Sequence, residues 1–200
     1  MAMRELLAST LYMLALINPV SKVLILSMLP KDAQTIAIAK ISLRASGIAL
    51  AILLVLAAAG NFILSTIFHV QLYSLQVAGG LVLLYIGFNA LTKGVFFEID
   101  AKESIADISV VPLASPLIAG PATITAAITF SVEHGFLEAC IAVTLAVIIN
   151  LIIMLSSRRL GGFLLSHNVM GALIRVTGLV VATIAVQMIL SGLSTWRALG

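Results

Sequence analysis

Two proline-centred segments hold the residues of this chain that are best suited to chemistry. Residues 18–21 read Asn-Pro-Val-Ser and residues 120–123 read Gly-Pro-Ala-Thr, so a hydroxyl follows each proline by two positions. Both segments lie in apolar surroundings, at matching places in the two halves of the chain. Proline lacks an amide proton and clashes with the preceding helical turn, so each one should break its helix. Polar backbone groups freed inside a membrane persist where protein lines a site, and the matched pair therefore predicts a binding site.

The chemistry expected at these breaks is the binding of a small anionic group. A helix that begins at proline presents its first free amides, and the positive end of its dipole, to the break. Two such helix starts near the membrane midplane can hold a carboxylate. Asn18 suits the N-cap position, where its side-chain oxygen would accept from a free amide, whereas Gly120 has no such side chain. The predicted substrate-binding residues are Asn18, Pro19, Ser21, Lys22, Ser115, Gly120, Pro121, Ala122, Thr123 and Thr125, with no catalytic or metal-binding residue predicted.

A purely structural alternative exists for these prolines. They could only kink packed helices, with the released carbonyls satisfied by neighbouring hydroxyls. Either break alone fits that explanation, but two breaks of the same pattern in the same order favour a site.

Lys22 is the charged residue that lies between apolar flanks of the first predicted span. A charge at membrane depth is costly and is a functional candidate by default. The ammonium could pair with a carboxylate substrate in the cavity. It could instead snorkel to the interface, because Lys31 and its loop lie only about two helical turns further on. The sequence leaves both alternatives open.

The composition identifies the elements that must position these residues. Of the 200 residues, 62% are hydrophobic and 10% are charged, with a mean hydropathy of +1.21, which indicates an integral membrane protein. A helix needs about 20 apolar residues to cross the bilayer. We predict an all-α membrane protein with six transmembrane helices, of which the first and fourth are broken at Pro19 and Pro121. The predicted spans are residues 6–29, 45–68, 70–92, 108–132, 139–157 and 176–196.

Lysine and arginine residues predict how the spans are oriented. They concentrate in the connections after the first, third and fifth spans, while the loops around His69 and His134 contain neither residue type. By the positive-inside rule, both termini lie outside the cell membrane and the charged loops are cytoplasmic. The net charge of +3 is scattered over short loops, so we predict the lipid bilayer and no nucleic acid as a partner.

The two halves of the chain predict an inverted repeat. Residues 76–87 and 175–186 share valine and glycine at equivalent positions, and the two proline segments correspond in the same order. Residues 1–95 form the first three-helix repeat, residues 96–109 a polar cytoplasmic linker, and residues 110–200 the second repeat. Because each repeat has an odd number of spans, the second is inverted, as in transporters that work by alternating access.

Motifs for other classes of protein are missing from the sequence. It has no Walker loop, dinucleotide fingerprint, nucleophile elbow or zinc-protease signature, so we predict neither an enzyme nor a resident cofactor. Four intramembrane amides, Gln76, Asn89, Asn150 and Gln187, most simply hydrogen-bond between helices, although one or two of them could line a pathway. The spans contain no acidic residue, which disfavours proton coupling through a carboxylate, yet both Na⁺ and H⁺ remain candidates for a coupling ion. Small residues on the spans leave a homo-oligomer open.

The proline segments resemble those of a known family. Residues 112–124 (Pro-Leu-Ala-Ser-Pro-Leu-Ile-Ala-Gly-Pro-Ala-Thr-Ile), the Asn-Pro element, the Gly-Gly of the third span and the last span are similar to the MarC family of six-span membrane proteins, which includes SnatA-type neutral amino acid transporters. The first motif departs from the family pattern, because Ser21, Lys22 and Leu24 replace Gly, Asn and Pro. That departure leaves substrate identity open.

The resemblance implies a function. It implies secondary transport of small neutral amino acids, of the glycine, alanine, serine and threonine class, by alternating access with ion coupling. The carboxylate of such a zwitterion would meet the half-helix N-termini, and its ammonium would meet carbonyls at the preceding helix ends. The alternatives are a passive channel, an exporter of another small solute, and a membrane scaffold without transport activity.

Overall fold

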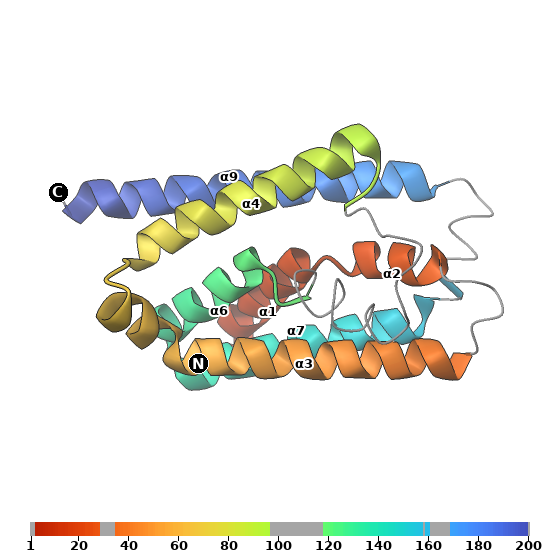
Figure 1. Cartoon of the computed structure of the whole chain (residues 1–200), viewed down its shortest axis with the longest axis horizontal. Helices are drawn as coiled ribbons and strands as arrows, with labels where there is room; N and C mark the ends of the chain where they lie inside the picture. The colour runs from red at the N-terminus through yellow and green to blue at the C-terminus, as the bar shows by residue number, and fades with distance from the viewer. Residues whose placement is uncertain (1–2, 29–34, 97–117, 158, 161–168, 200) are drawn as a thin grey trace.

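A computed structural model describes residues 3–28, 35–96, 118–157, 159–160 and 169–199 (Figure 1). The predicted site residue Ser115, the linker after Phe96 and the first part of the fourth predicted span lie outside these ranges. All regular elements within the described ranges are helices, so the all-α prediction is confirmed for them. The helices are α1 (Met3–Ile17), α2 (Pro19–Met28), α3 (Thr35–Phe62), the π-helix η1 (Ile63–Ile67), α4 (Leu72–Lys93), α6 (Pro121–His134), α7 (Phe136–Leu155) and α9 (Met170–Leu199).

Five segments of the described chain are long and apolar enough to cross a membrane: Arg4–Ser27, Ala37–Ile67, Leu72–Lys93, Phe136–Leu155 and Met170–Ala198. They correspond to five of the six predicted spans. The described part of the remaining one is α6, with 14 residues. Helices α3 and α9 begin several residues earlier than predicted, since a charged residue ends an apolar run without ending the helix.

The broken first span is the interior one. Within Arg4–Ser27, 67% of the most apolar window is buried, against 22–33% in the other four spans. Helix α7 packs against α1, α2, α3 and α6, while α4 packs against α9 and α6. In Figure 1, α4 and α9 lie along one side of the molecule, and both chain termini lie at the same end. The unbroken helices therefore surround α1, α2 and α6.

Glycines allow α4 and α9 to pack closely. A Cβ atom at Gly87 would lie 2.8 Å from the Ala182 amide nitrogen, and one at Gly192 would lie 2.7 Å from the Tyr73 carbonyl oxygen. The later residue of α4 thus contacts the earlier residue of α9, which shows that the two helices are antiparallel. The small residues of the third and sixth predicted spans are thus used for packing within one chain.

Candidate functional site

The first helix break is made by Asn18 and Pro19. Asn18 has a φ of 54°, in the left-handed region that asparagine tolerates better than most residues. Its amide donates to the Leu14 carbonyl at 2.9 Å, which closes the last turn of α1. Pro19 then starts α2, because its fixed φ suits a first helical position whose amide has no helical partner. The predicted break at Pro19 is confirmed.

The predicted N-cap role of the Asn18 side chain does not hold. An N-cap residue has extended backbone angles, whereas Asn18 is left-handed. In the described structure, the hydrogen bonds at this junction go to its carbonyl oxygen instead. The Ser21 amide donates to that oxygen at 3.2 Å, and Ser21 Oγ donates to it at 2.7 Å.

Lys22 reaches back across the same break. Its side chain is 1% exposed, and its ammonium donates to the Ile17 carbonyl and, at 3.2 Å, to Ser21 Oγ. Ile17 is the last residue of α1, where the helix dipole places partial negative charge, so a buried cation is stabilised there. The ammonium is therefore buried inside the protein and does not snorkel away from the break.

The second break uses a different backbone path. Gly120 is extended, with φ −86° and ψ 171°, and Pro121 is the first residue of α6, as predicted. Thr123 is 2% exposed, and its Oγ1 donates to the carbonyls of Ile118 at 2.7 Å and Gly120 at 2.9 Å. Thr123 and Ser21 thus make the same contact. Each hydroxyl donates to the carbonyl of the residue that precedes the proline.

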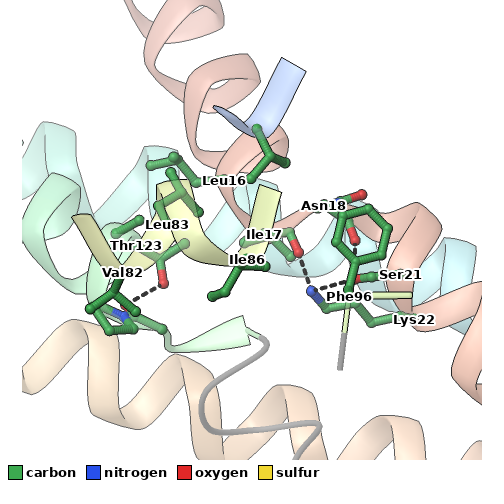
Figure 2. Close-up of a pocket in the computed structure, with 14 residues that line it drawn as sticks. Leu16, Ile17, Asn18, Ser21, Lys22, Val82, Leu83, Ile86, Phe96 and Thr123 are labelled. Atoms are coloured by element: carbon green, nitrogen blue, oxygen red, sulfur yellow. Dashed lines mark hydrogen bonds between the residues drawn. The ribbon is translucent and has the colours of Figure 1, made fainter. Parts of the chain in front are cut away.

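Both breaks open onto one cavity, which we call the central cavity (Figure 2). Its volume is about 30 Å³, against the roughly 10–15 Å³ that a cavity needs to hold one water molecule. Occupancy by a larger solute would require the lining helices to move apart. Of the predicted site residues, the following line it: Asn18, Ser21, Lys22, Gly120, Pro121, Ala122 and Thr123. Pro19 and Thr125 are not among its lining residues.

Apolar residues complete the wall of the central cavity, and sequence reasoning missed them. They are Leu16, Ile17, Val82, Leu83, Ile86, Phe96 and Val181. Nothing in an apolar span separates a cavity-lining leucine from a lipid-facing one, so the sequence carried no signal for most of them. Phe96 is the exception. Gly94 ends α4 in a left-handed conformation (φ 70°), a common helix stop, and the chain then buries Phe96 to 4% exposure.

A second, larger space of about 180 Å³ lies at the other end of α6, and we call it the terminal-side pocket. It is lined by Tyr12, Gln76, Thr125, Ala126, Thr129, Phe130, Glu133, Gln187, Met188 and Ser191. Gln76 Nε2 donates to Thr129 Oγ1 at 3.5 Å, and Thr125 Oγ1 donates to the Pro121 carbonyl at 2.7 Å. Of the four intramembrane amides, Gln76 and Gln187 line this pocket, whereas Asn89 and Asn150 line neither space. Glu133 was missed, because its position after an apolar run suggested a solvated loop.

Metal-ligating side chains do not cluster in the described residues. Among them, no group of three or more histidine, cysteine, aspartate or glutamate side chains could hold a metal ion.

These features define a class of protein, namely a multi-pass integral membrane protein whose described elements are helices and in which two helices that begin at proline line one cavity. The sequence matches the MarC family, described as MarC family integral membrane protein, over residues 3–197. The chain belongs to this family.

Relatives in other organisms agree with this assignment. The chain is similar to the UPF0056 membrane protein PH0214 of Pyrococcus horikoshii, with 38% identity over 190 residues that cover 95% of this chain and 94% of the relative. It is also similar to the UPF0056 membrane protein MJ1677 of Methanocaldococcus jannaschii, with 35% identity over 72% of this chain and 74% of the relative. The UPF0056 membrane protein of Aquifex aeolicus is 29% identical, and the match covers 92% of this chain and 89% of the relative. No significant match exists among solved structures.

Proposed function

We propose that this protein is a secondary transporter of small neutral amino acids and that the central cavity holds the substrate. One observation carries the proposal. Two helices that begin at proline, α2 and α6, open onto the same buried cavity from positions about one hundred residues apart. A membrane protein tolerates broken helices at depth where they line a site, and such paired breaks are typical of transporters.

The charges around the central cavity suit a zwitterion. The Lys22 ammonium and the N-termini of α2 and α6 are its positive groups, and they would attract a carboxylate. Its negative groups are backbone carbonyls at the breaks, such as those of Ile118 and Gly120, which Thr123 already contacts. These carbonyls would accept hydrogen bonds from the substrate ammonium.

The remaining wall favours a small and uncharged side chain on the substrate. Leu83, Ile86 and Val181 line the cavity from α4 and α9, and Lys22 is the one charged side chain among its described lining residues. A second charge on the substrate would have no partner there, and burying it would be costly. Glycine, alanine, serine and threonine meet this limit.

The packing of the helices supports alternating access. Helices α1 and α2 pack against α7, and α6 packs against α3, so each broken helix contacts the second helix of the other half. Helices α4 and α9, the last of each half, pack against each other. This exchange of contacts is what an inverted repeat would produce, and rocking of one half against the other would open the cavity to each side in turn. The prediction that both termini lie outside the cell agrees with two three-helix repeats of opposite orientation.

Counterflow in proteoliposomes tests the proposal. Purified protein is reconstituted with unlabelled alanine inside, and uptake of labelled glycine or alanine is followed with and without gradients of Na⁺ or H⁺. We expect saturable uptake, stimulated by one of the two gradients. Uptake without saturation or ion dependence would indicate a passive channel. No uptake of any small amino acid, from a protein that is folded by size-exclusion chromatography, would contradict the proposal.

A further inference from the structure

The terminal-side pocket has the opposite charge character to the central cavity. Its described lining includes one carboxylate, Glu133, together with two carboxamides, three hydroxyls and the Tyr12 phenol, and it includes no lysine or arginine. The described wall of the central cavity has Lys22 and no acidic residue. A positively charged group is therefore favoured in the terminal-side pocket, and a negatively charged group in the central cavity.

The two spaces lie in series along the helices. Four helices contribute to both of them, and along each helix the terminal-side residue comes from the end nearer the chain termini. The pairs, with the terminal-side residue first, are Tyr12 and Leu16 on α1, Gln76 and Leu83 on α4, Thr129 and Thr123 on α6, and Ser191 and Val181 on α9. Because the order agrees on all four helices, a solute that enters from the terminal end meets the terminal-side pocket first.

A close contact between helices separates the two spaces. A Cβ atom at Gly79 of α4 would lie 2.7 Å from Thr125 Oγ1, 3.3 Å from the Pro121 carbonyl oxygen and 3.6 Å from Met188 Cε. Thr125 and Met188 line the terminal-side pocket, whereas Pro121 lines the central cavity. Helices α4, α6 and α9 thus meet between the two spaces, with glycine at the contact point.

The size of the terminal-side pocket indicates a whole small molecule rather than a single ion. Its volume of about 180 Å³ is several times that of the central cavity, and it follows one face of α6 from Thr125 to Glu133, a rise of about 12 Å. The rings of Tyr12 and Phe130 lie 5.6 Å apart beside it. Aromatic faces attract cations, ammonium groups among them, and the Phe130 ring is also stacked on His134 at 5.7 Å.

We propose that the terminal-side pocket is a first binding site for the primary ammonium group of a small zwitterion, with Glu133 as its anionic partner. The inference rests on the proposed transport function and adds a recruiting step to it. The ammonium binds near Glu133 and the rings, and the carboxylate faces the Gly79 contact and Lys22 beyond it. When the α4–α6–α9 contact opens, the substrate enters the central cavity with its carboxylate leading.

Substitution of Glu133 tests this site in transport. We expect Glu133→Gln to raise the KM for alanine about two- to five-fold at low ionic strength, the size expected for losing an exposed ion pair, with the maximal rate unchanged. The difference should shrink in high salt, because exposed charges are screened. Glu5→Gln is the matched control, since Glu5 is an exposed carboxylate in the first turn of α1 outside the pocket.

Inhibition of alanine uptake by compounds that carry only one of the two charged groups gives a readout that a structural defect would not produce. Ethylammonium chloride carries only the positive group, and sodium propionate carries only the negative one. We expect Glu133→Gln to weaken inhibition by ethylammonium and to leave inhibition by propionate unchanged. If the variant keeps both inhibitions and the wild-type KM, the inference is wrong while the transport function stands. A changed Na⁺ dependence with an unchanged substrate KM would also overturn it, in favour of a coupling-ion site.

A binding measurement separates this inference from the proposed function. The thermal midpoint of purified protein in detergent is measured in ethylammonium chloride and in sodium chloride at equal ionic strength. We expect ethylammonium to stabilise the wild type and Glu5→Gln, but not Glu133→Gln. If the protein shows this pattern of midpoints but takes up no amino acid, the transport function is rejected and the proposed ammonium site stands. If each of the three proteins has the same midpoint in ethylammonium chloride as in sodium chloride, the proposed ammonium site is rejected, whether or not the protein takes up amino acids.

Discussion

The two helix breaks reach the same local arrangement by different backbone paths. At the first break, Asn18 alone interrupts the helix in a left-handed conformation, and at the second the chain approaches Pro121 through an extended Gly120. In both, a hydroxyl two residues after the proline donates to the carbonyl before it, from Ser21 at 2.7 Å and from Thr123 at 2.9 Å. The two breaks therefore share the proline and the hydroxyl, and they differ in the residue before the proline.

The breaks differ in how they satisfy the last carbonyl of the preceding segment. The Lys22 ammonium does this for Ile17, while the neutral hydroxyl of Thr123 does it for Ile118. Only the first break, among the described parts, thus brings a formal charge to the central cavity. The difference suggests that the first break selects the ligand charge and that the second supplies neutral hydrogen bonds.

The largest expected effect tests this difference directly. We expect Lys22→Met to raise the KM for alanine about 30-fold or more, since removing one partner of a buried charge pair costs roughly 2–5 kcal/mol. The measurement is counterflow, paired with the thermal midpoint of the purified variant to detect misfolding. Arg175→Met serves as the control, because Arg175 is exposed on α9 and lines neither space. An unchanged KM for the Lys22 variant would show that the ammonium only caps Ile17.

A smaller effect is expected for the neutral counterpart at the second break. Thr123→Val keeps the shape of the side chain but leaves the Ile118 carbonyl without its hydroxyl donor, which costs about 1–3 kcal/mol for a buried group. We expect a lower thermal midpoint and only a modest change in KM. Thr123→Ser, which keeps the hydroxyl, should recover most of the midpoint. A KM rise as large as that of Lys22→Met would mean that the two breaks contribute equally to binding.

The sequence predicted a large part of this arrangement. Proline chemistry correctly placed the starts of α2 and α6, and the resulting list of site residues identified seven that line the central cavity. The left-handed Asn18 was not predicted, because capping preference and left-handed tolerance both favour asparagine at a helix end, and only the fold chooses between them. The position of the Lys22 ammonium depends on a long, flexible side chain and therefore on packing.

Glu133 shows why the helical periodicity of the sequence did not predict the terminal-side pocket. The residue lies in the last turns of α6, and its neighbours in the terminal-side pocket come from α1, α4 and α9. A sequence pattern reports the face of one helix, whereas this pocket depends on four helices meeting at matching heights. The apolar lining of the central cavity was missed for the same reason.

The backbone difference at residue 18 gives the next prediction. Asn18→Ala should destabilise the protein by about 1–2 kcal/mol, the cost of a left-handed conformation for a residue with a Cβ and no local polar compensation. Asn18→Gly should cost much less, because glycine adopts this conformation freely. The thermal midpoint in detergent measures both. If the two variants are equally stable, the left-handed turn is not what maintains the first break.

The smallest expected effect separates hydroxyls at a break from hydroxyls elsewhere on α2. Ser21 Oγ contacts the Asn18 carbonyl and the Lys22 ammonium, so Ser21→Ala should cost about 0.5–1.5 kcal/mol. Ser27 Oγ donates at 2.5 Å to the Val23 carbonyl, which lies in the regular part of α2 and has a helical amide as a further donor. Ser27→Ala should therefore change stability by no more than about 0.5 kcal/mol. Equal midpoints for the two alanine variants would mean that the break gives Ser21 no special role, and the likeness between Ser21 and Thr123 would then be one of geometry alone.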